Sequence, residues 1–204
     1  EPLISIVTDK EASGYTASIM YKQPKSNSIT YSDYRKSLMQ NLYTSMLNSR
    51  FDELSQKPDA PFMYAGAGYG SFIGRTVDVY SLSLSAKENQ LDKSIEVVLT
   101  ENEKVRQFGF TASELERAKK DVLSYFENIA KEADKTQSGQ YADEFIRNYL
   151  DQECIPGIKK ENEIVQEYIP GIKLEEINNM GKAWITDKNM LALITAQEKE
   201  GMKI

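Results

Sequence analysis

Residues 109–119 read Gly-Phe-Thr-Ala-Ser-Glu-Leu-Glu-Arg-Ala-Lys, and they predict where one helix ends and the next begins. Gly109 follows a run of apolar residues with helical spacing, and glycine is typical just past a helix C-terminus. Thr111 and Glu114 have the spacing of a capping box, in which the two side chains bond the first free backbone N–H groups of a helix. Leu115 then begins the apolar face of the second helix. The stretch therefore predicts two consecutive helices that meet at Gly109.

Two pairs of strands are predicted upstream of these helices. Residues 3–8 (LISIVT) and 15–21 (YTASIMY) are rich in strand-forming residues, and the turn-forming residues between them favour an antiparallel pair. Residues 62–72 (FMYAGAGYGSF) and 75–86 (RTVDVYSLSLSA) alternate in character, which favours a β-hairpin. In the second strand of this hairpin, the serines share one face and the large apolar residues share the other: Ser81, Ser83 and Ser85 against Tyr80, Leu82 and Leu84.

Apolar residues at helical spacing predict a long helix over residues 31–55, with Ser32 as its N-cap. Further helices are predicted around Tyr141, Phe145, Ile146 and Tyr149, and over residues 174–184, before a last strand at 189–195. The order of strands and helices predicts an α+β fold, with an antiparallel sheet and helices packed on one face. The length fits one domain over residues 1–204 or a tight pair of subdomains.

Gly66, Gly68 and Gly70 invite comparison with a nucleotide-binding loop. Their spacing is wrong for that motif, and a strand follows where a helix would be needed. We therefore interpret them as a glycine-rich strand that another backbone or a helix approaches closely.

Composition excludes several classes of function. The 204 residues carry 25 Lys and Arg against 31 Asp and Glu, a net charge of −6, which argues against a nucleic-acid-binding protein. No apolar run is long enough to predict a membrane span. The sequence has no histidine and one cysteine, Cys154, which excludes a Cys-cluster zinc site and histidine-based nucleophilic catalysis. Carboxylate pairs lie on predicted exposed helix faces, where a solvated surface is the simpler interpretation: Asp52/Glu53, Glu114/Glu116, Glu161/Glu163 and Glu175/Glu176.

Residues 109–119 resemble the G-[FL]-x-x-x-E-L-x-x-A-K signature of the C-terminal-type domain of M16 zinc peptidases, the pitrilysin and processing-peptidase group. Other stretches resemble the same family, the last three being similar to its bacterial subgroup: 47–54 (LNSRFDEL), the hairpin 62–86, 155–158 (IPGI), 170–177 (PGIKLEEI) and 184–185 (WI). The resemblance covers nearly the whole chain.

The resemblance implies a domain of a four-domain clam shell that encloses unfolded peptides. In this family zinc is held by an H-x-x-E-H motif in the first domain, and a chain without histidine cannot contain that motif. The implied role is a non-catalytic domain without a cofactor of its own, with zinc in the catalytic domain of the longer protein. The implied partners are other M16 domains of the same chain or a partner subunit, together with unfolded peptides. Two alternatives stay open: a catalytically inactive partner subunit, and a structural or assembly module.

The last domain of the family carries an Arg and a Tyr that grip substrate. The best-matching region here has Tyr64, but Lys57 stands where the Arg is expected, and Lys lacks the bidentate fork of Arg. This departure favours the second domain of the longer chain. The resemblance then implies contacts with an extended peptide at Lys57, Tyr64, Gly66, Gly68 and Gly70, through strand-like pairing and aromatic contact. The bacterial subgroup suggests a periplasmic or cell-envelope location, with a cytoplasmic one as the alternative.

Overall fold

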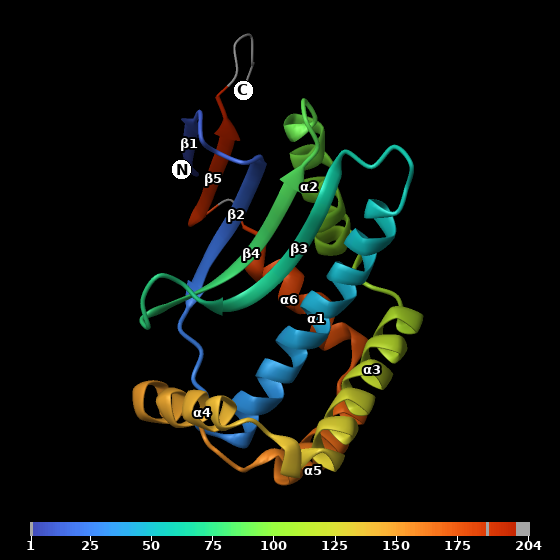
Figure 1. Cartoon of the computed structure of the whole chain (residues 1–204). Coiled ribbons are helices and arrows are strands. Elements are labelled where there is room, and N and C mark those ends of the chain that lie inside the picture. The colour runs from blue at the N-terminus through green and yellow to red at the C-terminus, as the bar shows by residue number, and fades with distance from the viewer. Residues whose placement is uncertain (1, 187, 199–204) are drawn as a thin grey trace. The chain divides into compact units, whose positions relative to one another are not determined.

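The computed structural model describes residues 2–186 and 188–198, which form five strands, six α-helices and two short 3₁₀ turns (Figure 1). In chain order these are β1 (Leu3–Asp9), β2 (Tyr15–Pro24), α1 (Tyr31–Ser55), β3 (Phe62–Ser71), β4 (Val77–Ala86), α2 (Leu91–Phe108), α3 (Ala112–Lys131), η1 (Ala133–Lys135), α4 (Ser138–Asp151), α5 (Ile158–Tyr168), η2 (Ile169–Gly171), α6 (Leu174–Trp184) and β5 (Met190–Gln197). The predicted α+β class and the predicted order of elements are confirmed.

The strands form one sheet in the order β1-β5-β2-β4-β3. The pairs β2–β4, β2–β5 and β3–β4 are antiparallel, whereas β1 runs parallel to β5. The sheet is therefore mixed, and the predicted pairing of β1 with β2 is wrong. The physical reason is that β5, from the far end of the chain, pairs with β2 and occupies the place that a local hairpin would have given to β1.

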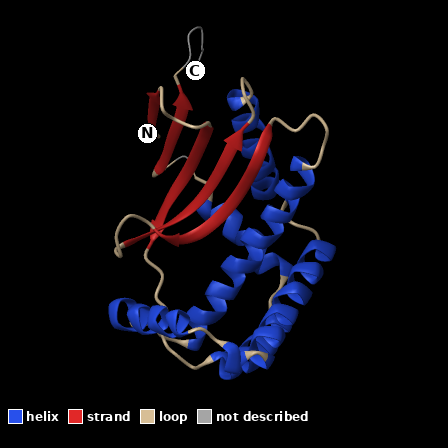
Figure 2. Ribbon diagram, viewed as in Figure 1, coloured by secondary structure: helices blue, strands red, loops and turns tan. Residues whose placement is uncertain are grey.

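The chain divides into two compact units. The first unit comprises residues 1–25, 44–109 and 178–204, and it contains the sheet. In it the helices lie behind the sheet as drawn in Figures 1 and 2, and α2 packs against β2, β3 and β4. Trp184 is buried here with its ring 4.7 Å from that of Tyr69 and 5.2 Å from that of Tyr80. Trp184 therefore anchors the end of α6 to the sheet.

The second unit comprises residues 26–43 and 110–177 and is helical. The ring of Phe110 meets that of Tyr43 edge-on at 5.1 Å, and Leu115 is buried below the first turn of α3. The predicted capping box of α3 is present, because Glu114 and Thr111 each bond the other's backbone N–H. These side chains of residues 109–119 therefore stabilise the fold.

The first turn of α1 is capped two residues earlier than predicted. The N–H of Asp33 donates to Thr30 Oγ1 at 3.1 Å, and the N–H of Thr30 donates to the Asp33 carboxylate at 2.9 Å. Thr30 therefore replaces Ser32 as the N-cap, because the pair Thr30–Asp33 satisfies two N–H groups reciprocally.

The helix α4 confirms the prediction around residues 141–149 but buries none of its residues. Its large apolar side chains are exposed, from 40% for Leu150 to 85% for Tyr149.

Candidate functional site

The face of the sheet opposite α2 forms rows of uncharged side chains, most of them small. The registers of β2, β3, β4 and β5 place these residues side by side in three rows: Tyr64–Ser85–Thr16–Thr195, Gly66–Ser83–Ser18–Leu193 and Gly68–Ser81–Met20–Leu191. Alternation along each strand puts their neighbours Leu82, Leu84 and Ile19 on the opposite, buried face. We call these twelve residues the serine–glycine face. The predicted separation of serines from large apolar residues on β4 is thus confirmed.

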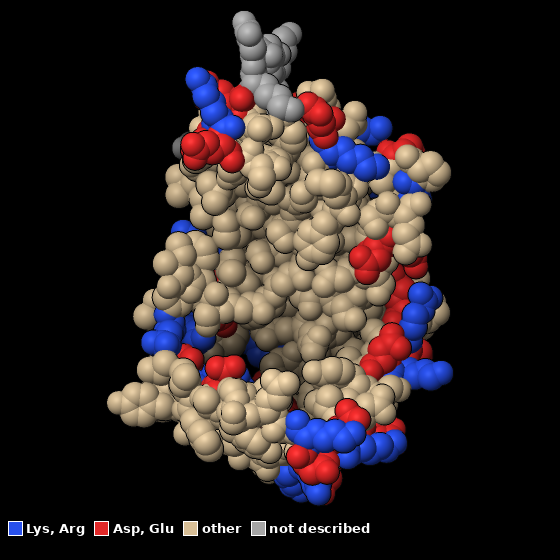
Figure 3. Space-filling model, in the orientation of Figure 1, with Lys and Arg blue, Asp and Glu red and all other residues tan. Residues whose placement is uncertain are grey.

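The serine–glycine face carries no charge. Figure 3 shows the surface over the middle of the sheet without Lys, Arg, Asp or Glu, while charged side chains gather around its margins. The face offers hydroxyl groups, one exposed aromatic ring, the exposed side chain of Leu193 and space beside Gly68. Such a surface suits contact with peptides of varied sequence, because it has no charge to select for or against a side chain.

Tyr64 is the large ring on this face. It is 57% exposed and lies on β3 opposite Ser85. Its ring covers the next residue on the same face, since a Cβ built on Gly66 would lie 2.9 Å from Tyr64 Cζ and closer still to the hydroxyl. Gly66 is therefore the position that allows the ring to lie flat along the strand.

The expected close approach at Gly68 and Gly70 is wrong. A Cβ on Gly68 would meet Ser81 Oγ at 3.7 Å, an ordinary contact, and one on Gly70 would meet nothing within 4 Å. The helix approaches β3 elsewhere, because Asn48 on α1 bonds the backbone of Ala67. These glycines leave space on the outer face of the sheet.

Lys57 lies in the turn that follows α1. It is exposed, its N–H donates to the carbonyl of Leu54, and its carbonyl accepts from the N–H of Ala60. Lys57 and Tyr64 belong to the same unit, on either side of the start of β3. The glycines share the strand of Tyr64, whereas Lys57 stands on a loop.

At the centre of the outer edge of β3, the backbone groups already have hydrogen-bond partners. Asn48 Nδ2 donates to the carbonyl of Ala67 at 3.1 Å, and the N–H of Ala67 donates to Asn48 Oδ1 at 2.6 Å. In an antiparallel pair, alternate residues point both backbone groups away from the neighbouring strand. An extended peptide that paired with β3 would have to displace Asn48 at Ala67. The broad face beside Tyr64 is free of this obstacle.

The chain does not offer the ligands of a zinc peptidase. It has no histidine, and among residues 2–186 and 188–198 no group of three or more His, Cys, Asp or Glu side chains is placed to hold a metal ion. Cys154 is exposed on the loop after α4, with its sulfur 3.1 Å from the carbonyl of Ile29. These donor groups do not fit a zinc site, so we derive no chemical step through a metal. None of the described helices is long and apolar enough to cross a membrane.

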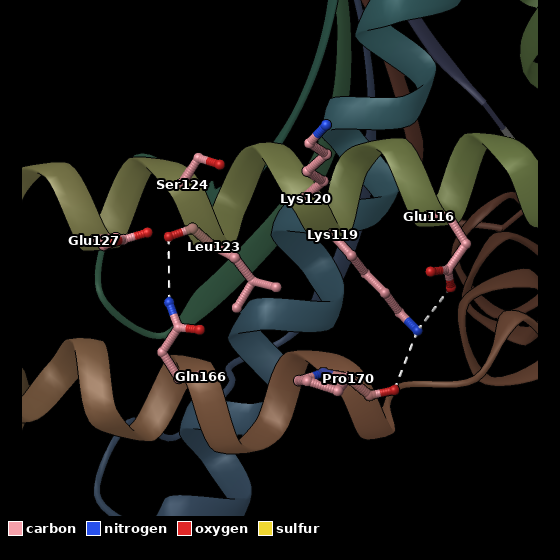
Figure 4. A pocket seen from close by; sticks show the side chains of 8 residues that line it. All are labelled: Glu116, Lys119, Lys120, Leu123, Ser124, Glu127, Gln166 and Pro170. Atoms are coloured by element: carbon pink, nitrogen blue, oxygen red, sulfur yellow. Dashed lines mark hydrogen bonds and ion pairs between the residues drawn. The ribbon is translucent and has the colours of Figure 1, made fainter.

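A surface hollow of about 320 Å³ lies in the helical unit, between α3 and the segment of α5 and η2 (Figure 4). Three of its polar side chains are bonded within the hollow. The ammonium of Lys119 lies 3.3 Å from both the carbonyl of Pro170 and the carboxylate of Glu116, and Gln166 donates to the carbonyl of Leu123. These bonds join α3 to α5 and η2.

Two carboxylates of the helical unit have shifted pKa values of opposite sign. Burial raises the pKa of Glu161, although its hydrogen bond from the Tyr34 hydroxyl, 2.7 Å long, acts against the shift. Arg35 lowers the pKa of Glu176 through two hydrogen bonds of 2.9 and 3.0 Å. The sequence predicts solvated surface for both carboxylates, because side-chain partners distant in the chain leave no signal in local spacing.

The chain has the fold of an M16 peptidase domain. It superposes with a TM-score of 0.88 on the first half of the periplasmic protease PqqL from Escherichia coli, at 13% identity, covering 96% of this chain and 42% of that one. An inactive M16 peptidase domain from Pseudomonas fluorescens gives a TM-score of 0.66 at 10% identity, covering 100% of this chain and 45% of that one.

In sequence, the chain is 26% identical over 164 residues to a PQQL-like zinc protease of Arabidopsis thaliana. The match covers 80% of this chain and 14% of that protein, so the chain spans about one seventh of the relative's length. No family model matches the chain. In both fold and sequence, the chain is similar to domains of M16 peptidases of the insulinase and PqqL type.

Proposed function

We propose that the chain is a non-catalytic domain of a longer zinc-dependent M16 metallopeptidase, and that its serine–glycine face forms part of the wall of the peptide-enclosing chamber. The observation that carries this proposal is an uncharged sheet face with one exposed ring, Tyr64, in a chain without histidine. Zinc and the water-activating Glu belong, on this proposal, to an H-x-x-E-H domain elsewhere in the longer protein.

The position proposed is the second of four domains, directly after the catalytic one. Lys57 supports it, because a Lys in a loop cannot supply the planar two-point grip that the last domain of the family obtains from Arg. The proposed contacts with peptide are Lys57, Tyr64 and the strand that carries Gly66, Gly68 and Gly70. Because Asn48 occupies the β3 edge at Ala67, contact through the face is favoured over strand pairing at that edge.

The test compares two tyrosines of nearly equal exposure, Tyr64 at 57% and Tyr125 at 59%. In the longer protein, Tyr64→Ala removes one aromatic contact worth about 1 kcal/mol. We expect this substitution to raise KM for an unfolded peptide about fivefold and to leave kcat nearly unchanged, since binding of ground state and transition state is lost equally. Tyr125→Ala on α3 is the control and should change neither constant.

A lower kcat at constant KM for Tyr64→Ala would contradict the proposal, because it would mean that this domain contacts the substrate specifically in the transition state. Unfolding of the 204-residue chain by Tyr64→Ala, measured by circular dichroism, would assign the ring to the fold instead.

A second candidate is a catalytically inactive subunit that binds peptide while a partner chain supplies zinc. The similarity in fold to an inactive M16 domain favours keeping it. The discriminating measurement is peptide hydrolysis by the longer protein alone: activity only after mixing with a second M16 chain would favour the inactive subunit.

A further inference from the structure

The two edge strands of the sheet, β3 and β1, differ in what lies beside their outer backbone groups. At the β3 edge, Asn48 bonds both backbone groups of Ala67. At the other edge, β1 has β5 as its one neighbour among the described residues. Alternate N–H and C=O groups of β1 therefore point away from the sheet, because a strand that pairs on one side leaves every second residue facing outward.

β1 also exposes large apolar side chains on both of its faces. All seven of its residues are exposed. Leu3 and Val7, at 62% and 47%, lie opposite Leu191 and Thr195 on the side of the serine–glycine face. On the other side Ile4 is 65% and Ile6 51% exposed, so the helix layer does not cover them.

This edge lacks the features that keep an exposed strand from pairing. Edge strands of soluble proteins are commonly interrupted by Lys, Pro or a bulge. From Leu3 to Asp9 the strand has none of these residues, and Asp9 at its end is its one charged side chain. Its register with β5 runs without a shift from Leu3 to Asp9. A regular, uncharged, apolar edge is the kind that adds another strand.

We propose that β1 is an interface strand, and that it pairs with a strand of another M16-type domain in the same longer chain. The inference rests on the proposed function and names the surface through which the domains join. A bare peptide along β1 would bond its backbone but leave Leu3, Ile4, Ile6 and Val7 largely in water. A folded domain covers the edge and both faces together. The solved PqqL half is more than twice as long as this chain, so further chain accompanies this fold there.

A second copy of this chain is the competing occupant. Seven residues of strand are about 23 Å long, and pairing along that length alone buries little of the roughly 1,200–2,000 Å² typical of stable interfaces. We therefore expect the 204-residue chain to be a monomer by itself.

The test is hydrogen exchange of the β1 amides in the 204-residue chain and in the longer protein. We expect outward-facing β1 amides to exchange at least about tenfold more slowly in the longer protein. Ile6→Lys places a charge on β1, and Ile73→Lys places the same charge on a residue of the β3–β4 connection that is 93% exposed. In the longer protein, Ile6→Lys should abolish the added protection and Ile73→Lys should keep it, while both substitutions should leave the fold of the short chain intact.

Equal exchange of β1 in the two proteins would overturn the proposal. So would a concentration-dependent dimer of the short chain, measured by sedimentation, that Ile6→Lys dissociates, because β1 would then pair with a second copy. If the longer protein contains no other M16-type domain, the proposed function fails and this proposal fails with it. Unprotected β1 in a protein that has such a domain defeats the interface proposal alone and leaves the Tyr64 measurement unaffected.

Discussion

Asn48 binds both backbone groups of Ala67 and so joins α1 to the edge of the sheet. The side-chain amide stands where a further strand would otherwise pair. Because the carbonyl and the N–H are bonded by the same side chain, losing it leaves two backbone groups without partners at once.

We therefore expect Asn48→Ala to destabilise the chain by about 1–3 kcal/mol. For a chain of this size each kcal/mol lowers Tm by about 2–4 °C. The measurement is thermal unfolding followed by circular dichroism. Ser49→Ala is the matched control on the same helix, because Ser49 bonds the carbonyl of Ser45 within α1 and is exposed. A Tm for Asn48→Ala equal to that of the control would mean that water replaces the amide without cost.

Gly66 and Gly68 should respond differently to the same substitution. Gly68→Val adds a side chain over open space beside Ser81, and valine favours strands. We expect the free energy of unfolding to change by less than about 0.5 kcal/mol or to rise. Gly66→Val meets the Tyr64 ring and must move it, so chemical shifts of that ring should change in the Gly66 variant and stay nearly constant in the Gly68 variant. A large loss of Tm in Gly68→Val would show that something packs on the serine–glycine face.

The bounds of several helices and the faces of a strand could be predicted from local sequence patterns. The periodicity of residues 31–55 gave both ends of α1, and the spacing of Thr111 and Glu114 gave the start of α3. The alternation of serine with leucine on β4 gave its two faces. Each of these signals depends on residues within one or two turns of one another, which is the range over which propensity and periodicity act.

Local sequence patterns could not predict which distant segments of the chain pair or bond with one another. Turn-forming residues between β1 and β2 indicated a hairpin, but β5 arrives from more than 160 residues away and takes that place. The bonds from Asn48 to Ala67, and from Lys119 to Pro170, likewise join distant segments. The candidate face could be located because a strand's alternation marks it. The closed edge at Ala67 could not, since an asparagine within a helix has no distinctive spacing.

Lys119, within residues 109–119, should contribute to stability through its ammonium group. Its side chain is 11% exposed and lies 3.3 Å from the carbonyl of Pro170 in η2 (Figure 4). Lys119→Met keeps the aliphatic stem and removes the donor, so we expect a loss of about 1–2 kcal/mol in urea unfolding. Lys120→Met is the neighbouring control and should stay within about 0.5 kcal/mol. Equal effects of the two variants would show that the bond to Pro170 contributes nothing net.

Glu161 and Glu176 should give stability changes of opposite sign as pH rises. Burial raises the pKa of Glu161 above its ordinary value of 4.5, so the folded chain binds that proton more tightly than the unfolded chain. Stability then falls as pH rises from 4.5 through the raised pKa. The nearby charges are Glu144 and Glu153, which add to the shift, and Arg147, which opposes it. Glu161→Gln does not titrate and can still accept from Tyr34, so it should resemble the wild-type chain at pH 4 and become more stable than it toward pH 7.

For Glu176 the sign reverses. Arg35 lowers its pKa below 4.5, so the pair stabilises the fold above that pH, and the stabilisation is lost as pH falls through the lowered pKa. Glu176→Gln should therefore be less stable than the wild-type chain at pH 7, with a difference that shrinks on acidification. Thermal unfolding of the wild-type chain and both variants from pH 3 to pH 8 measures this. Curves for the two variants that shift in the same direction with pH, relative to wild type, would show that the burial of Glu161 does not govern its protonation.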